Sequence, residues 1–362
     1  MTDEEILLRR LHGQFLLAPG GVRKVARGLC GLQAQFFSNA LHALRIRCGH
    51  EPAESELAPL CKTWTIRGTI HLIDRDDLPL FLHEGRERFW RPCDTMEDDD
   101  AFTAERKRLF AGVILERVGQ GISQREALKE ACAAAGMTEA EAGSAFNAWG
   151  GLIRALCEAG KLCHLPAQKK AFAVCAPMEP MPRSEARTEL LRRYWTHYGP
   201  ATVRDAAAFF AARQRDIRET LETLPVRRAE SRGETFYWLE NGFDGAREAP
   251  RCVFLAGFDP LLMGYCKERS LMLAPENLRA IYSLAGIVSP ALLLDGRVAG
   301  RWKREGKKAR ATFFAAPDAS ARRDGGLPPA VGEGATPAAW LTALAEGRWT
   351  ALPVGGDAWL LT

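Results

Sequence analysis

Several features that would place this chain in a common class are missing from its sequence. Residues 1–10 are acidic before they are apolar, so the basic segment and apolar core of a secretory signal are absent. No apolar run approaches the roughly 20 residues that a membrane-spanning helix needs. We therefore expect a cytoplasmic protein without a membrane partner.

Metal-binding patterns are missing too. The ten cysteines form no Cys-x-x-Cys pair, and the seven histidines do not stand at zinc-ligand spacings; Cys163-His164 is an isolated dipeptide. In a reducing compartment such cysteines are best interpreted as small buried hydrophobes. We therefore expect neither a metal site nor a cofactor.

The chain also lacks a strong excess of one sign of charge, with 49 basic against 45 acidic residues and a net charge of +4. This balance permits a nucleic-acid partner but does not argue for one. What is present is typical of a soluble globular protein: 362 residues, 47% hydrophobic and 26% charged. The length predicts two or three domains of ordinary size.

A pattern of helices followed by a small β-hairpin occurs three times. The first copy has helices within residues 4–47, a short helical element from Pro52 and two strands about Arg67-Gly68 in residues 64–73. This order is the winged-helix pattern, and tandem copies predict a repeat array.

The second copy contains a predicted capping box, in which Ser123 caps a helix and Glu126 follows three residues later. The third contains Thr202 as the N-cap of a helix that runs through Phe210. The predicted helices and strands of these two copies are helices 106–117, 146–160, 190–198, 202–210 and 216–224, and strands 162–165, 171–174, 226–228 and 235–239.

From Arg251 the apolar periodicity changes to two, which predicts strands, and Asp295-Gly296 is a two-residue hairpin signal. We interpret this region as a small antiparallel β-barrel with a Gly/Pro-rich tail, in which residues 337–346 form a short helix. The predicted class is therefore α+β, with three tandem winged-helix domains before the barrel. The predicted domains are 1–100, 101–184, 185–248 and 249–362.

Gln33 and Gln35 flank a single small apolar residue, Ala34. Residues two apart lie on one side of an extended chain but roughly 200° apart on a helix, so a shared task requires an extended or turning backbone at the mouth of a helix. The two amides can hold a water molecule in a chosen orientation but cannot take up a proton at neutral pH. The alternative interpretation is two surface or capping glutamines.

Six basic residues and one acid occupy residues 301–310, between two predicted strands. A hairpin tip with this charge suits a phosphate backbone, and the candidates are Lys303, Arg304, Lys307 and Lys308. The alternative is a solvated turn. Arg45, which follows the glutamines, could steer DNA toward the same place. Winged helices usually bind DNA, although they also mediate protein contacts.

Four segments resemble, in their order, the signature segments of the AlkZ-type (YcaQ-related) winged-helix DNA glycosylases of bacteria. The likeness covers about residues 1–315, and the tail after Asp318 has no counterpart that we can place. The segments are Gly31-Leu32-Gln33-Ala34-Gln35, Arg67-Gly68-Thr69-Ile70-His71, Tyr198-Gly199-Pro200-Ala201-Thr202 and Phe258-Asp259-Pro260-Leu261-Leu262-Met263-Gly264-Tyr265-Cys266-Lys267-Glu268-Arg269.

The resemblance implies three winged helices, a β-barrel and removal of alkylated purines in DNA repair or self-resistance. Some members of the family unhook interstrand crosslinks. The family's catalytic glutamine–apolar–glutamine motif falls on Gln33 and Gln35, and sister branches carry Asp at the second position. The resemblance also implies a minor-groove hairpin, for which residues 264–269 are our candidate. The remaining DNA-binding candidates in the matching segments are Arg67, His71, Tyr265, Lys267 and Arg269.

An N7- or N3-alkylated purine is positively charged and is therefore a good leaving group. The barrier then lies in stabilising an oxocarbenium-like sugar and delivering water to C1′, which two positioned amides can assist. We expect a monofunctional, monomeric glycosylase that acts on double-stranded DNA carrying cationic alkylated purines. The alternative is a non-catalytic winged-helix DNA-binding or regulatory protein.

Overall fold

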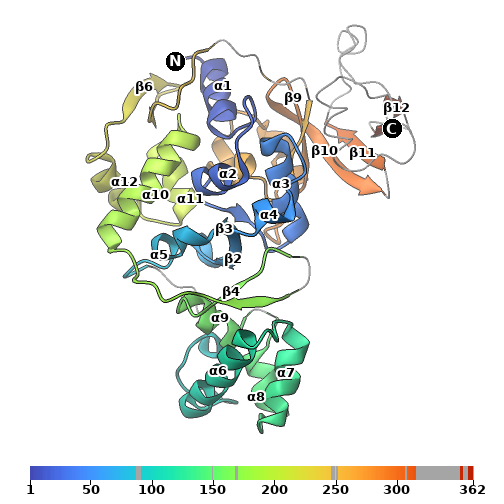
Figure 1. The fold of residues 1–362 in the computed structure, drawn as a ribbon. Helices are drawn as coiled ribbons and strands as arrows, with labels where there is room; N and C mark the ends of the chain where they lie inside the picture. Colours follow the sequence, from blue (N-terminus) through green and yellow to red (C-terminus); the bar gives the residue numbers. More distant parts are fainter. Residues whose placement is uncertain are drawn as a thin grey trace. The chain divides into compact units, whose positions relative to one another are not determined.

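A computed structural model describes residues 1–86, 91–148, 150–167, 170–245, 249, 252–305, 308–314, 351–353 and 358–361. The chain divides into two compact units (Figure 1). Unit 1 combines Met1–Leu57 with Thr188–Thr362, and unit 2 is the continuous stretch Ala58–Arg187. The prediction of four domains stays a prediction. No helix in the described residues is long and apolar enough to cross a membrane.

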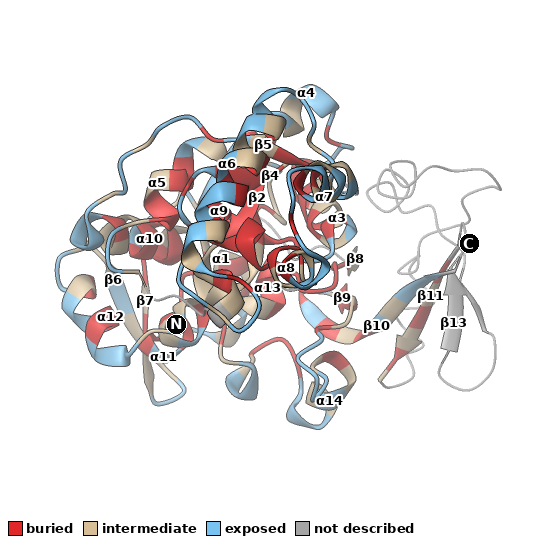
Figure 2. Ribbon diagram, turned by 90° about the horizontal axis from the view of Figure 1, so that it is seen from below, coloured by how far each residue is buried: buried red, intermediate tan, exposed pale blue. Residues whose placement is uncertain are grey.

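The longer helices of unit 1 are amphipathic and bury one face (Figure 2). The first begins at an N-cap, where the Thr2 hydroxyl accepts a hydrogen bond from the Glu5 amide, and it buries Ile6, Leu7 and Leu11. The helices are α1 (Asp3–Gly13), α2 (Val22–Gly28), α3 (Phe37–Cys48), α4 (Glu54–Leu57), α10 (Arg183–His197, which begins in unit 2), α11 (Val203–Phe210), α12 (Gln214–Leu221), α13 (Pro260–Met263) and α14 (Leu278–Ile281).

The predicted N-cap at Thr202 is confirmed. Its hydroxyl accepts a hydrogen bond from the Asp205 amide at 3.1 Å, and the Asp205 carboxylate accepts one from the Thr202 amide at 2.9 Å. The hairpin of β6 (Arg227–Ser231) and β7 (Glu234–Trp238) follows the helices. Its tip residues, Arg232 and Gly233, both have positive φ, as a type I′ turn requires.

The remaining strands of unit 1 form a six-stranded antiparallel sheet in the order β12-β13-β11-β10-β9-β8. The predicted hairpin at Asp295-Gly296 joins β9 to β10, and both residues have positive φ. Within the described residues this order is open, so closure into a barrel stays a prediction. The strands are β8 (Cys252–Phe254), β9 (Ala291–Leu294), β10 (Arg297–Glu305), β11 (Lys308–Phe313), β12 (Ala351–Pro353) and β13 (Ala358–Leu361), and the short β1 (Leu32–Gln33) lies elsewhere in the unit.

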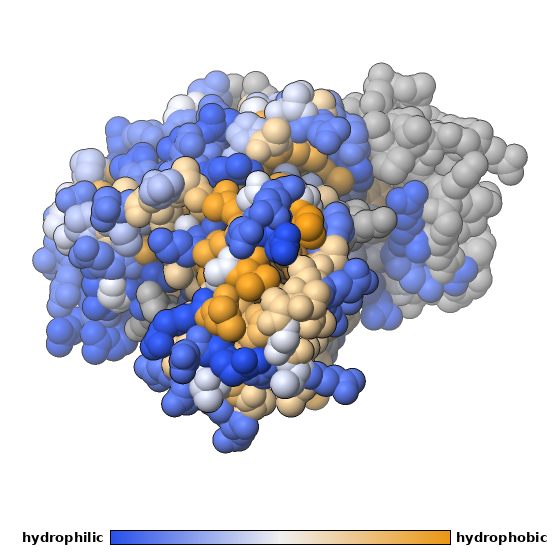
Figure 3. Space-filling view, turned by 60° about the horizontal axis from the view of Figure 1, so that its bottom comes forward, coloured by the Kyte–Doolittle hydropathy of each residue, from blue (hydrophilic) through white to orange (hydrophobic). Residues whose placement is uncertain are grey.

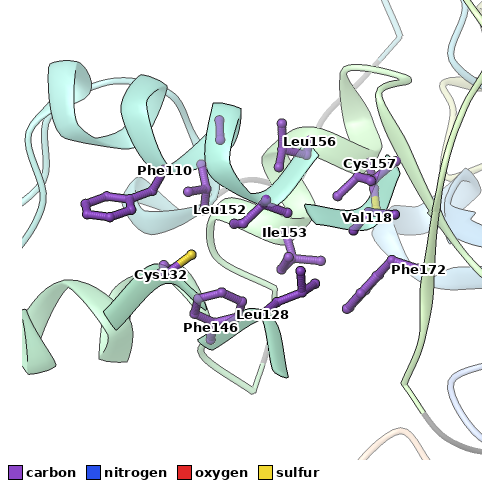
Figure 4. Packing of buried hydrophobic residues seen from close by; sticks show 14 of the residues in the cluster. Phe110, Val118, Leu128, Cys132, Phe146, Leu152, Ile153, Leu156, Cys157 and Phe172 are labelled. Atoms are coloured by element: carbon purple, nitrogen blue, oxygen red, sulfur yellow. The ribbon is translucent and has the colours of Figure 1, made fainter. Parts of the chain in front are cut away.

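In unit 2, a sheet in the order β3-β2-β4-β5 brings together the hairpins of the first two predicted winged helices. Helices α6 to α9 enclose an apolar core that includes Phe110, Leu152 and Phe172 (Figure 4). The elements are β2 (Leu60–Trp64), β3 (Ile70–Asp74), β4 (Leu162–His164), β5 (Phe172–Val174), α5 (Leu78–Phe81), α6 (Ala104–Gly119), α7 (Arg125–Ala134), α8 (Glu139–Ala145) and α9 (Leu152–Glu158).

Two local predictions in unit 2 are wrong. Ser123 does not cap α7: its carbonyl oxygen instead accepts a hydrogen bond from the Phe172 amide, and Gln124 occupies the N-cap position. A capping box occurs at Thr138 and Glu141, at the start of α8. The helix predicted for residues 146–160 begins only at Leu152, because Gly150 and Gly151 have positive φ and interrupt it.

The structure is therefore a mixed α/β protein with antiparallel sheets. All ten cysteines are free thiols, and seven of them are buried. Hydrophilic residues cover most of the face drawn in Figure 3, and apolar residues gather in one area of it. The predicted helix at residues 337–346 and Lys307 lie outside the described residues, as do Gln168 and Lys169 at the tip predicted between β4 and β5.

Candidate active site

Gln33 lies just after the C-terminal end of α2. Cys30 and Gly31 both have positive φ, and the Gly31 amide donates to the Ala26 carbonyl at 2.8 Å, which closes the helix. The chain then reverses and runs extended through Leu32 and Gln33 as β1. A glycine suits position 31 because the left-handed conformation costs it little.

Gln33 is buried, with 9% of its surface exposed. Its side-chain carbonyl oxygen, Oε1, has no hydrogen-bond partner among the described residues. A buried acceptor left unpaired costs about 1–3 kcal/mol, so native proteins rarely retain one without a reason. The described residues thus leave this acceptor, which has almost no accessible surface of its own, without a donor.

Gln35 follows two residues later and is exposed. The backbone bends at Gln35 and Phe36, and α3 begins at Phe37. The prediction that the glutamines occupy extended or turning backbone at the mouth of a helix is confirmed. The side-chain amide of Gln33 thus lies in the interior and that of Gln35 lies at the surface, with only Ala34 between the two residues.

Two contacts attach α3 to the rest of unit 1. The His42 imidazole Nε2 donates to the Phe254 carbonyl on β8 at 2.7 Å, and burial lowers the pKa of His42. In the last turn, Arg47 donates from both terminal nitrogens to the Asp259 carboxylate at 2.6 and 3.0 Å. Both members of this ion pair are fully buried. The helix that starts beside Gln35 is therefore held at its middle and at its end.

A hydrogen-bond chain links Arg47 to the turn before the glutamines. Arg47 contacts the side-chain carbonyl oxygen of Gln14, Oε1, at 3.5 Å. The side-chain nitrogen of Gln14, Nε2, donates to the Tyr265 hydroxyl at 3.0 Å. The Tyr265 hydroxyl donates to the Tyr198 carbonyl at 2.9 Å. The Tyr198 hydroxyl in turn donates to the Leu29 carbonyl at 2.9 Å. Two of the four segments noted in the sequence thus meet in one buried network, which reaches Leu29, two residues before the segment that holds the glutamines.

The family model described as DNA glycosylase AlkZ-like matches residues 26–340. The chain belongs to this family. The match includes Gln33 and Gln35, and it extends beyond residue 318 into part of the tail.

Two comparisons reach AlkZ-like proteins of Streptomyces sahachiroi. A relative described as "Interstrand DNA cross-link repair glycosylase" is 28% identical over 345 residues, covering 83% of this chain and 87% of the relative. The solved structure of the DNA glycosylase AlkZ from that organism has a TM-score of 0.68 at 23% identity, covering 88% of this chain and 92% of that one. At that identity the structural likeness supports the fold.

Residues 264–269, the candidate minor-groove hairpin of this AlkZ-like chain, do not form a hairpin. Gly264 ends α13, and Lys267–Arg269 form a 3-10 helix. Tyr265 is 8% exposed and burial raises its pKa, so its hydroxyl serves the buried network described above. Lys267 and Arg269 are exposed, although Arg269 pairs with Glu234 at 2.6 Å. These two remain candidates for DNA contact.

Unit 2 holds Arg67 and His71. Arg67 has a positive φ of 57° between β2 and β3, an uncommon conformation for a residue other than glycine. His71 is 2% exposed, and burial, followed by the Arg67 charge, lowers its pKa to about 3. The Thr65 hydroxyl lies 2.8 Å from its Nδ1. A buried neutral imidazole favours a role in holding the Arg67 turn over direct contact with phosphate.

Among the other predicted DNA-binding residues, Arg45 is largely covered and pairs with Glu51. Lys303 and Arg304 are exposed, but they lie within β10 and not at a loop tip. Lys308 begins β11 opposite Glu305. Sequence reasoning missed the buried ion pair of Arg47 with Asp259, although Phe258-Asp259 opens one of the matching segments.

Proposed function

We propose that this protein is a monofunctional DNA glycosylase that hydrolyses the N-glycosidic bond of cationic alkylated purines in double-stranded DNA. The observation that carries the proposal is the buried, unpaired carbonyl oxygen of Gln33, two residues from the exposed amide of Gln35. Membership of the AlkZ-like family supports it. The finer fold proposal is three winged helices followed by a small barrel, acting as a monomer.

In this mechanism the lesion supplies much of the driving force. An N7-alkylguanine or N3-alkyladenine departs as a neutral base, and the sugar passes through an oxocarbenium-like state. The Gln33 oxygen accepts a hydrogen bond from the attacking water and orients it, and its partial negative charge favours the developing positive charge on the sugar. Gln35 binds the water from the surface side. Because neither amide can accept a proton at neutral pH, both act by positioning, and the proton that the water loses on bonding to C1′ passes to solvent.

Crosslink unhooking is part of the proposal. The 28% identical relative is described as an interstrand DNA cross-link repair glycosylase. A bulky alkyl group on N7 of guanine creates the same cationic leaving group as a methyl group does. We therefore propose that crosslinks formed through such bonds are substrates as well, in DNA repair or self-resistance.

The test incubates the pure protein with duplexes containing N7-methylguanine, N3-methyladenine, hypoxanthine, uracil or 8-oxoguanine. Base release is followed by chromatography. We expect release of the two cationic purines alone, since the neutral bases need stronger acid assistance than two amides give. Efficient uracil release would contradict the mechanism. Release of no base, with tight binding to one undamaged sequence, would favour the non-catalytic regulator.

A further inference from the structure

Phe36 directly follows Gln35, and half of its surface, 50%, is exposed. Among the large hydrophobic residues exposed in the described part of the chain, it is the one aromatic residue. A single exposed apolar side chain needs no explanation. What distinguishes Phe36 is its position beside the glutamines and the way that its ring is supported.

The support is Phe258. The two rings stack with centroids 6.0 Å apart and an interplanar angle of 21°. Phe258 is 8% exposed and has a φ of +56°, a strained conformation for a bulky residue. Its amide donates to the Val288 carbonyl at 3.2 Å, and the next residue is Asp259, which Arg47 holds. One face of the Phe36 ring therefore rests on a fixed partner.

The backbone of Phe36 is fixed as well. It occupies the N-cap position of α3, and its carbonyl accepts a hydrogen bond from the Asn39 amide at 3.0 Å. A rigid aromatic ring that is covered on one face and half exposed is suited to stacking. An aliphatic side chain of the same size would offer an apolar contact but no π face.

We propose that Phe36 is a stacking platform for the target base, and that its π face favours a cationic alkylpurine over a neutral purine. The inference rests on the proposed function, and it adds a recognition residue to the same site. The face of an aromatic ring attracts cations, and base–aromatic stacking tolerates many bases. The same positive charge that makes the lesion a good leaving group would then also select it during binding.

The experiment measures equilibrium binding of the full-length protein to two duplexes that resist hydrolysis. Both contain a 2′-fluoro sugar; one carries cationic N7-methylguanine, and the other carries 7-methyl-7-deazaguanine, which is neutral and has nearly the same shape. We expect the wild type to prefer the cationic base by about threefold to thirtyfold. Phe36→Leu and Phe36→Met should reduce this preference to near one, whereas Phe36→Trp should retain it.

The matched control is Leu109→Ala, which removes an apolar side chain of similar exposure, 53%, on α6. It should leave the charge preference unchanged. Base release by the wild type is measured in parallel. Failure to release any base would overturn the proposed function. Normal release with an undiminished charge preference in both Phe36→Leu and Phe36→Met would overturn this inference alone.

Discussion

Gln33 is a residue whose chemistry opposes the stability of the fold around it. Its buried Oε1 leaves an acceptor without a partner among the described residues, and the folded state carries that cost. Active sites retain such features because the reaction uses them. An apolar residue of similar shape would remove that cost and, under the proposed mechanism, the activity.

We therefore expect Gln33→Met to raise the free energy of unfolding by about 1 kcal/mol and to lower base release by roughly tenfold to a thousandfold. The comparison is Gln35→Met. It should lower release similarly while leaving stability within about 0.5 kcal/mol of the wild type, because Gln35 is exposed. Urea unfolding and single-turnover kinetics provide the two measurements. Destabilisation by Gln33→Met would show that the native protein pairs this oxygen.

His71 should make stability depend on pH. Its pKa is lowered from 6.5 to about 3 in the folded protein, mainly by burial, so the unfolded chain takes up a proton first as the pH falls. The stability that neutral His71 contributes is complete above pH 6.5 and is lost progressively toward pH 3. The free energy of unfolding is measured with urea for His71→Gln and for the wild type between pH 7 and pH 4. Plotted against pH, it should have a slope shallower in His71→Gln than in the wild type by up to about 1.4 kcal/mol per pH unit. Parallel curves for the two proteins would contradict the burial of a neutral imidazole.

At the scale of elements, the strand β10 separates basic residues that are close together in the sequence and places them on its two opposite faces. Successive residues of a strand point to opposite faces. Trp302 faces inward, where its indole N–H donates to the Leu255 carbonyl at 2.8 Å. Arg304 shares that face, whereas Arg301 and Lys303 lie on the opposite one. A single duplex lying flat against the hairpin meets only one of these faces.

We expect the double substitution Arg301→Ser/Lys303→Ser to reduce the slope of log K against log salt by about 2, because each lost phosphate contact removes about 0.9. Arg304→Ser should change the slope much less. Binding titrations from low to moderate ionic strength measure both. Equal effects from the two faces, or none from either, would place the DNA elsewhere.

The link between α3 and α13 depends on a buried ion pair, Arg47 with Asp259. Asp259→Ala leaves the Arg47 charge buried without its carboxylate partner, so unfolding should become easier by about 3–5 kcal/mol. The double substitution Arg47→Met/Asp259→Ala should recover much of this loss. Chemical denaturation of the three proteins measures the effect. A double variant no more stable than Asp259→Ala would mean that the helix cap made by Asp259, and not the charge pair, dominates.

Local signals in the sequence predicted much of this fold. The hairpin at Asp295-Gly296 was predictable because a two-residue turn needs particular residues, and so were the two strands about Arg67-Gly68 and the cap at Thr202. Ser123 was misjudged because its carbonyl oxygen accepts a bond from Phe172, far along the chain, a contact that no local pattern reveals.

The candidate site likewise has features that the sequence predicts and features that depend on tertiary contacts. The extended backbone at Gln33 and Gln35 follows from their spacing, but the burial of one and exposure of the other depends on tertiary packing. The Phe36–Phe258 stack joins residues more than 200 positions apart, and a single sequence gives no signal for such a pair. Tyr265 and His71 belong to matching segments, yet burial assigns them supporting positions.

At the scale of the whole molecule, the two units differ in how the chain builds them. Unit 2 is one continuous stretch, whereas unit 1 joins the first 57 residues to those from Thr188 onward. The hydrogen-bond network of Arg47, Gln14, Tyr265, Tyr198 and Leu29 spans that gap, since Tyr198 bonds to Leu29 and Tyr265 bonds to Gln14. The N-terminal helices on either side of the proposed site therefore depend on partners encoded far downstream.

This order has a consequence during synthesis. A ribosome makes the 130 residues of Ala58–Arg187 after the glutamine segment has been made and before Tyr198 exists, a delay on the order of ten seconds. Through that interval the apolar residues of α1 and α2 lack their final neighbours, and at its end unit 2 has its whole sequence. The nascent chain should therefore fold from its middle outward, and its N-terminal segment is the part on which a chaperone has the longest time to act.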